Sequence, residues 1–244
     1  MFSPRYANHG STSEGSLKVL NFVVNVLSPL RSKIYFVKSL IECVEFRYWA
    51  KKKFPGVKIT ASKYSLLNEI LDKTSTHSKL NFLEFGVAFG ETTQFLLDKV
   101  KTNFSYTGFD TFEGLPSSWR NLPKGAITAG GKIPLIQDER VRFIKGFVEK
   151  TLPGIEISSS DTKIFLFDLD LFSPTLFVYQ EIRKHINPGD VLYFDEAFDS
   201  AERIIIENYV LNDFDVDPIG ISPFAIAFFV RSKIPHNLKE ISIN

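Results

Sequence analysis

Acidic side chains recur at the ends of the apolar segments that we expect to form a sheet. From residue 64 onward such segments alternate with helical patterns, an order typical of a parallel sheet covered on both faces. The segments are LNFLEFG (80–86), FSYTGFD (104–110), VRFIKGF (141–147), KIFLFDLD (163–170) and DVLYFDE (190–196). Four of them end in acids, which are Glu84, Asp110, Asp168 with Asp170, and Asp195 with Glu196. Helix capping explains one or two of these acids, but ligand binding beyond the carboxyl ends of parallel strands explains all of them.

The stretch EFGVAFGETTQ, residues 84–94, is typical of a strand that turns into a helix. Gly86 allows a ligand to approach the backbone closely, and the helix that begins near Glu91 offers free N–H groups to an anionic group. A dinucleotide fingerprint, G-x-G-x-x-G, has a middle glycine where this chain has Ala88, and Glu84 would repel a pyrophosphate. Glu84 suits a ligand that carries a cation, such as S-adenosylmethionine. A glycine turn without any ligand remains the alternative.

Asp110 strengthens the cofactor hypothesis. It ends the next strand, where an acid accepts hydrogen bonds from ribose hydroxyls in dinucleotide folds. Phe112 follows and offers an apolar surface to an adenine ring. Two neighbouring strands with acidic ends therefore favour a cofactor that contains adenosine.

Four motifs carry a resemblance to a known family. They are EFGVAFGETT (84–93), YTGFDTFEGLP (106–116), FIKGFVEKTLP (143–153) and DLDLFSPTLFVYQEIRKHINPGDVLYFDE (168–196). With these motifs the chain resembles the macrocin-type O-methyltransferases, S-adenosylmethionine-dependent enzymes that act largely on sugar hydroxyls of natural products. The resemblance and the strand ends together give the expected cofactor-binding residues: Glu84, Phe85, Gly86, Gly90, Glu91, Thr92, Asp110, Thr111, Phe112, Gly146 and Phe147.

The resemblance also implies a divalent metal site. Family members hold the metal with acids that fall by position on Asp168, Asp195 and Glu196, although the family usually has aspartate at the last position. Phe172 and Pro174 replace the usual tyrosine and serine. The residues themselves point the same way, because buried carboxylates need compensation and no basic residue stands beside them in either segment. Oxygen ligands without cysteine or histidine favour Mg²⁺. The alternatives are solvated acids, or an acid that keeps its proton.

These observations predict a Mg²⁺-assisted O-methyltransferase that acts on a hydroxyl of a sugar, a glycosylated natural product or a polysaccharide. Asp168 would hold the metal, and Asp170 would be the general base, because on a regular strand it shares a face with Asp168. The long loop 113–139 would close over the site, with Trp119 and Arg120 as candidate acceptor contacts. The alternatives are a catechol or phenol O-methyltransferase, a non-catalytic cofactor-binding or assembly module of the same fold, and a dehydrogenase.

The expected fold is a Rossmann-like, doubly wound α/β domain over residues 59–244, with seven mostly parallel strands. A flexible tail (1–15) and a helical extension (16–58) would precede it. A net charge of +1 disfavours nucleic acid as a partner, and the apolar run 19–30 is too short to span a bilayer. The single cysteine, Cys43, favours a cytoplasmic location. The aromatic residues of 16–53 favour packing on the domain or in a homodimer over contact with a membrane surface.

Overall fold

The computed structural model describes residue 22 and residues 31–101, 103–159 and 161–235. The expected tail, 1–15, and most of the segment 16–30 lie outside the described residues. The chain divides into two compact units, residues 1–41 and 42–244. Helix α2 (Arg31–Lys53) begins in the first unit and ends in the second. Within the first unit its apolar side chains Ile34, Val37 and Ile41 are half exposed.

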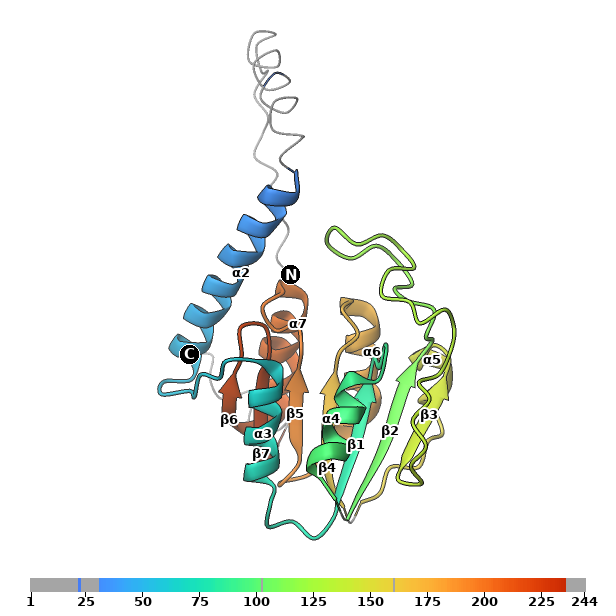
Figure 1. Ribbon diagram of the computed structural model, residues 1–244. Coiled ribbons are helices and arrows are strands. Elements are labelled where there is room, and N and C mark those ends of the chain that lie inside the picture. Colours follow the sequence, from blue (N-terminus) through green and yellow to red (C-terminus); the bar gives the residue numbers. More distant parts are fainter. Residues whose placement is uncertain (1–21, 23–30, 102, 160, 236–244) are drawn as a thin grey trace. The chain divides into compact units, whose positions relative to one another are not determined.

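The second unit contains a twisted sheet, and its strands appear as arrows in Figure 1. The strands of the described residues are β1 (Leu80–Phe85), β2 (Phe104–Asp110), β3 (Val141–Lys145), β4 (Thr162–Phe167), β5 (Val191–Phe194), β6 (Phe214–Ile221) and β7 (Ile226–Lys233). They form one sheet in the order β3-β2-β1-β4-β5-β7-β6. The first five pair in parallel, whereas β7 runs antiparallel to both β5 and β6. The predicted seven-stranded, mostly parallel sheet is confirmed.

Helices cover both faces of this sheet (Figure 1). Besides α2, the described helices are α3 (Lys63–Lys73), α4 (Glu91–Lys99), α5 (Val148–Thr151), α6 (Phe172–Ile182), α7 (Ser200–Ile205) and α8 (Leu211–Asp213). A 3₁₀ turn, Arg183–His185, follows α6, and a π-helical turn, Ile206–Val210, joins α7 to α8. Helices α3 and α4 pack in one apolar cluster, and α5, α6, α7 and the end of α2 pack in the other.

The alternation of side chains along the central strands explains these two layers. In β4, Ile164 and Leu166 point into the cluster with α3 and α4, while Phe165 and Phe167 point into the opposite cluster. Successive strand residues face opposite sides of a sheet, so a continuous apolar segment is what a strand buried on both faces requires. The chain winds outward from β1 in one direction and from β4 in the other, and a ligand crevice is expected between them.

Four of the five predicted strands end earlier than the sequence suggested, and β1 and β3 stop at Phe85 and Lys145. Strand β4 stops at Phe167 and β5 stops at Phe194, so the acids that follow them lie in loops. The last strands, β6 and β7, complete the sheet. Among the described residues, no helix combines the length and the apolar character that crossing a membrane demands.

Candidate active site

The turn after β1 contains two glycines with positive φ, and one of them approaches the backbone of another loop closely. Gly86 has φ +91°, and a Cβ atom there would lie 1.7 Å from the carbonyl oxygen of Asp168. Any side chain at this position would therefore push β1 and the loop after β4 apart. Gly90, with φ +79°, is the N-cap of α4, so the helix begins at Glu91 as predicted. Gly86 thus lets the two central strand ends come together.

Asp110 holds the glycine turn in place. Its Oδ2 accepts hydrogen bonds from the N–H groups of Val87 (2.8 Å) and Ala88 (2.7 Å), and its Oδ1 accepts one from Phe112 N (2.7 Å). A carboxylate oxygen has two lone-pair sites, so Asp110 can bind the turn and still accept from a ligand. Ala88 adopts φ +49°, a conformation that costs a non-glycine residue energy and that these hydrogen bonds stabilise.

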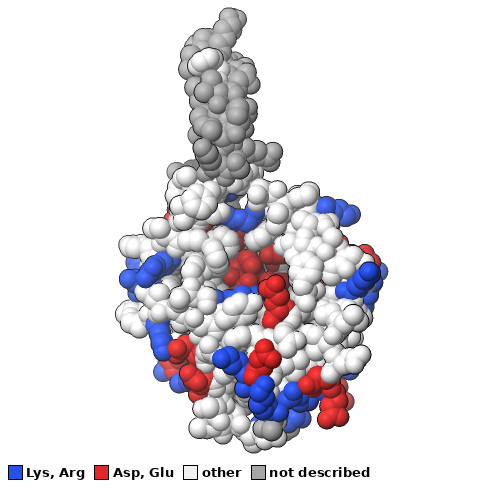
Figure 2. All heavy atoms as spheres, viewed as in Figure 1, with Lys and Arg blue, Asp and Glu red and all other residues white. Residues whose placement is uncertain are grey.

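A cavity of about 710 Å³ opens beyond the carboxyl ends of the central strands. Figure 2 shows it as a hollow with acidic side chains at its floor and Lys or Arg atoms beside them. Of the residues predicted from the sequence, the following line it: Gly86, Glu91, Thr92, Asp110, Thr111, Gly146, Phe147, Asp168, Asp170, Asp195 and Glu196. The cavity lies at the point where the strand order reverses, and its volume is within the range of small-molecule sites.

Four predicted cofactor residues do not line the cavity. Glu84, Phe85 and Phe112 are at most 2% exposed, and Gly90 faces the side chain of Pro134 in the long loop. The ring of Phe112 packs edge-on against Phe143, so it is not the free apolar surface that we expected for adenine. The Glu84 carboxylate accepts a hydrogen bond from the Tyr106 hydroxyl beneath the cavity.

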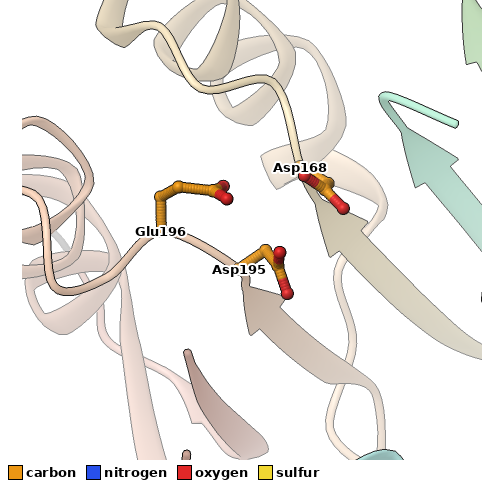
Figure 3. Close-up of side chains that lie close together, drawn as sticks. All are labelled: Asp168, Asp195 and Glu196. Atoms are coloured by element: carbon orange, nitrogen blue, oxygen red, sulfur yellow. The ribbon is translucent and has the colours of Figure 1, made fainter. Parts of the chain in front are cut away.

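Three acids come together where the resemblance implied a metal site. Asp168 follows β4, and Asp195 and Glu196 follow β5, and each offers an oxygen within 4.8 Å of the others. Figure 3 shows their carboxylates around a common space beyond two adjacent strand ends. The Tyr193 hydroxyl donates to Asp195 Oδ1, whereas Glu196 Oε2 is buried without a hydrogen-bond partner among the described residues.

Lys63, which the sequence analysis missed, also reaches this cluster. Its Nζ lies 3.5 Å from Asp168 Oδ2 and 3.6 Å from Asp195 Oδ2. Burial lowers the pKa of Lys63, but the neighbouring carboxylates, with Asp168 and Asp195 foremost, outweigh burial and raise the pKa above its ordinary value. The side chain therefore stays an ammonium and supplies one positive charge to the cluster.

Glu202 is a second residue that the sequence did not reveal. It lies on α7, is 1% exposed, and accepts a hydrogen bond from Glu196 N (3.1 Å), while its Oε1 has no partner among the described residues. Burial, together with the neighbouring carboxylates, raises the pKa of Asp168, Glu196 and Glu202 well above their ordinary values. With Glu202, the three partly buried acids of the cluster outnumber the one ammonium that faces them.

Asp170 does not lie on a strand, so the expectation that it shares a strand face with Asp168 is wrong. The strand has ended at Phe167, and Asp170 adopts φ +61° in the following turn. It nevertheless lines the cavity. Burial, and then the Asp195 carboxylate, raise the pKa of Asp170 to about 7.

The long loop contributes Gly114, Leu115 and Trp119 to the cavity wall. Arg120, in contrast, turns away into an ion-pair network with Glu42 of α2 and with Asp199, 3.2 Å away at the N-cap of α7. Its guanidinium also lies over the Phe198 ring. Trp119 remains a candidate acceptor contact, but Arg120 fastens the loop to the domain.

The family comparison decides the enzyme class. Residues 83–197, which include the glycine turn and all three clustered acids, match the family model of a methyltransferase domain. The chain is an S-adenosylmethionine-dependent methyltransferase. The match covers the strands and loops that build the cavity, so the predicted enzyme class is confirmed.

Solved structures of similar fold are also methyltransferases. The O-methyltransferase NovP has a TM-score of 0.50 and 16% sequence identity, with 69% of this chain and 80% of that chain covered. CalS11, a TDP-rhamnose 3'-O-methyltransferase of calicheamicin biosynthesis, has a TM-score of 0.45 and 22% sequence identity, with 67% of this chain and 75% of that chain covered. The O-methyltransferase TomG of Streptomyces achromogenes has a TM-score of 0.43 and 15% sequence identity, with 78% of this chain and 89% of that chain covered. No curated protein matches the chain by sequence. The likeness to NovP, together with the strand order, confirms the predicted Rossmann-like fold.

Proposed function

We propose that this methyltransferase acts on oxygen, with Mg²⁺ assistance, and methylates a hydroxyl of a sugar, a glycosylated natural product or a polysaccharide. The observation that carries the proposal is the position of Asp168, Asp195 and Glu196. Their oxygens cluster at the same cavity that the Gly86 turn opens. Methyl donor and acidic cluster would therefore share one compartment.

The donor set fits a magnesium ion. All three acids offer hard oxygen ligands, and Mg²⁺ prefers oxygen. The buried Glu196 Oε2 has no partner among the described residues, so it is available as a ligand. Glutamate in place of the usual aspartate keeps the ligand type.

The chain's own residues account for the remaining steps. A bound Mg²⁺ would acidify a nearby hydroxyl and stabilise its conjugate base. Asp170 lines the cavity and would accept the hydroxyl proton as general base. S-adenosylmethionine, when bound, would supply the methyl group, which would pass from its sulfur to the hydroxyl oxygen and leave S-adenosylhomocysteine. The Gly86 turn and Asp110 would hold the cofactor so that oxygen, carbon and sulfur align.

The cofactor would span the cavity from Asp110 to the Gly86 turn. Asp110 and Thr111 would contact the ribose, and the N-terminus of α4, with Glu91 and Thr92, would hold the amino-acid end. Phe147, which is 46% exposed at the cavity, offers an apolar surface to the adenine. Support for this assignment comes from the shared cavity and from the acid-ended strands.

The sugar acceptor rests on the resemblance to the macrocin-type enzymes, to which we propose that the chain belongs. Their GFD-x-F-EGLP motif runs from the end of β2 into the loop that walls the cavity, and Leu115 and Pro116 of that motif line it. A catechol-like acceptor is the alternative, because two neighbouring hydroxyls on an aromatic ring would reach the same acidic cluster. A non-catalytic module is the other alternative.

A product assay separates these possibilities. The purified protein is incubated with S-adenosylmethionine, Mg²⁺ and a panel of glycosides and catechols, and mass spectrometry detects methylated acceptor and S-adenosylhomocysteine. We expect methylation of a glycoside, loss of activity in EDTA, and recovery on addition of Mg²⁺. Methylation of catechols alone would contradict the sugar acceptor. Cofactor binding without turnover on any acceptor would favour the non-catalytic module.

A cytoplasmic location and a homodimer also remain proposals. The single Cys43 supports a reducing compartment. Exposed apolar residues of α2, such as Val44 and Tyr48, support a contact with a second copy. Light scattering of the full chain would test the dimer, and a monomeric mass at micromolar concentration would contradict it.

A further inference from the structure

Lys63 is the first residue of α3 and reaches the acidic cluster from outside the two acidic loops. The N-cap Ser62 fixes the start of the helix by accepting a hydrogen bond from Ser65 N. The Lys63 side chain, 30% exposed, lines the cavity and extends to Asp168 and Asp195. The helix start therefore delivers an ammonium group to two of the three proposed metal ligands.

The ammonium compensates only part of the cluster's charge. Glu84, Asp168, Asp195 and Glu196 all interact electrostatically with Lys63. One positive charge thus faces four acids, and its distances of 3.5 and 3.6 Å leave it at the edge of hydrogen-bonding range. Glu196 Oε2 has no partner among the described residues. The ammonium of Lys63 therefore lies at the site but leaves part of the negative charge of the acids uncompensated.

A lysine ammonium and a divalent ion cannot use the same carboxylate oxygens at the same time. Magnesium–oxygen bonds are about 2.1 Å long, so an ammonium that stays on those oxygens would lie close to the ion and repel it. Lys63 has a flexible stem and a partly exposed side chain, so its head can move into the cavity. The two cations are therefore expected to exclude one another.

We propose that Lys63 is a positioning residue that serves as the counter-ion of Asp168 and Asp195 in the metal-free enzyme, and that metal binding displaces its ammonium. This inference rests on the metal site of the proposed function. In the metal-free state Lys63 holds the two carboxylates near one another. Lys63 lowers the affinity for the metal ion, because the ion must displace the ammonium before it can bind the two carboxylates. Lys63 thereby sets how tightly the enzyme holds its metal.

The test is a titration with Mn²⁺, a substitute for Mg²⁺ that calorimetry and electron paramagnetic resonance both detect. It compares the wild-type chain with Lys63→Met, Lys63→Arg and Lys58→Met. Lys58 is a matched control, because it precedes the same helix and pairs with Glu69 at the surface. We expect Lys63→Met to bind Mn²⁺ at least about tenfold more tightly than wild type, since a nearby positive charge is lost. Lys63→Arg and Lys58→Met should stay within about threefold of wild type, since the first keeps the charge and the second is screened by solvent.

Thermal unfolding gives a second readout that does not depend on activity. In EDTA, Lys63→Met should melt about 3 °C below wild type, because the acids lose their counter-ion. Saturating Mn²⁺ should raise its melting temperature more than that of wild type. Binding of S-adenosylmethionine by each variant confirms that the fold is intact.

Each outcome of the titration is decisive. Equal affinity in wild type and Lys63→Met, or weaker binding in Lys63→Met, would overturn the inference while the metal site stands. Absence of Mn²⁺ binding in all four proteins would overturn both the inference and the metal part of the proposed function. Methyl transfer that persists in EDTA would confirm that the protein has no metal site, since the enzyme would then act without a metal.

Discussion

Two groups of lysine and acidic side chains lie at opposite ends of β4 and β5. They differ in how completely the negative charges are compensated by positive charge and hydrogen bonds. At the amino ends, Lys163 Nζ lies 3.1 Å from Asp190 Oδ2, and both side chains are at most 3% exposed. Asp190 also accepts hydrogen bonds from the N–H groups of Lys163 (2.8 Å) and Asn187 (2.7 Å). At the carboxyl ends, Lys63 faces several acids, and Glu196 Oε2 has no partner among the described residues.

The difference separates a structural ion pair from a ligand site. One cation, one anion and a full set of hydrogen bonds leave nothing at the amino ends for a ligand to satisfy. The carboxyl ends combine an excess of partly buried acids with a cavity of about 710 Å³. An ionisable cluster that is both buried and incompletely compensated is the feature expected where charge must be available for a ligand.

Breaking the balanced pair should cause the largest loss of stability. Lys163→Met leaves Asp190 buried without its cation, so we expect the free energy of unfolding to fall by about 3–5 kcal/mol. Urea denaturation followed by circular dichroism would measure this change. Mn²⁺ affinity should be unchanged, because the pair lies at the other end of the strands. A loss below about 1 kcal/mol would contradict a structural role.

At the unbalanced end, removing a buried acid should stabilise the protein instead. Burial raises the pKa of Glu84 to about 7, against the hydrogen bond from Tyr106 and the charge of Lys63. A carboxyl group with a raised pKa binds its proton more tightly when folded, so stability falls as pH rises from about 4.5 to about 7. Glu84→Gln should lack this loss and be more stable above pH 7 by up to about 3 kcal/mol.

Urea denaturation of wild type and Glu84→Gln at pH 5 and pH 7.5 would measure how the difference in unfolding free energy changes with pH. The stability difference between the two proteins should grow with pH. A difference that shrinks, or that is the same at both values, would mean that Glu84 is compensated like Asp190. Glutamine keeps an oxygen that accepts from the Tyr106 hydroxyl, so the variant changes charge and little else.

A smaller effect is expected at the loop that walls the unbalanced site. Arg120→Ala removes the ion pairs with Glu42 and Asp199, which should ease opening of residues 113–139 by about 1–2 kcal/mol. Limited proteolysis within this loop should then be about 5- to 30-fold faster. Arg231→Ala, which removes an exposed pair with Asp215, is the control and should not change the rate. Equal rates for both variants would show that Arg120 does not fasten the loop.

The sequence revealed the site's strands and acids but not its compensating charge. Alternating apolar segments predict the sheet, and the shared edge of parallel strands predicts that Asp168 and Asp195 meet. Lys63 lies 105 residues before Asp168 on a helix, and no local pattern shows that its side chain reaches the cluster. Glu202 is hidden in the same way, because it reads as one charge on an amphipathic helix. Asp170 was placed on a strand face because the sequence does not show that β4 ends at Phe167.

The central claim is that the unbalanced acids bind a divalent cation in the cofactor compartment. Its most direct test is Mn²⁺ binding to wild type and to Asp168→Asn, measured by electron paramagnetic resonance, with S-adenosylmethionine binding measured in parallel. We predict one Mn²⁺ site in wild type, an affinity lower by at least about a hundredfold in Asp168→Asn, and cofactor affinity retained in both. Unchanged Mn²⁺ affinity in Asp168→Asn, or a wild-type protein that binds no Mn²⁺, would contradict the claim.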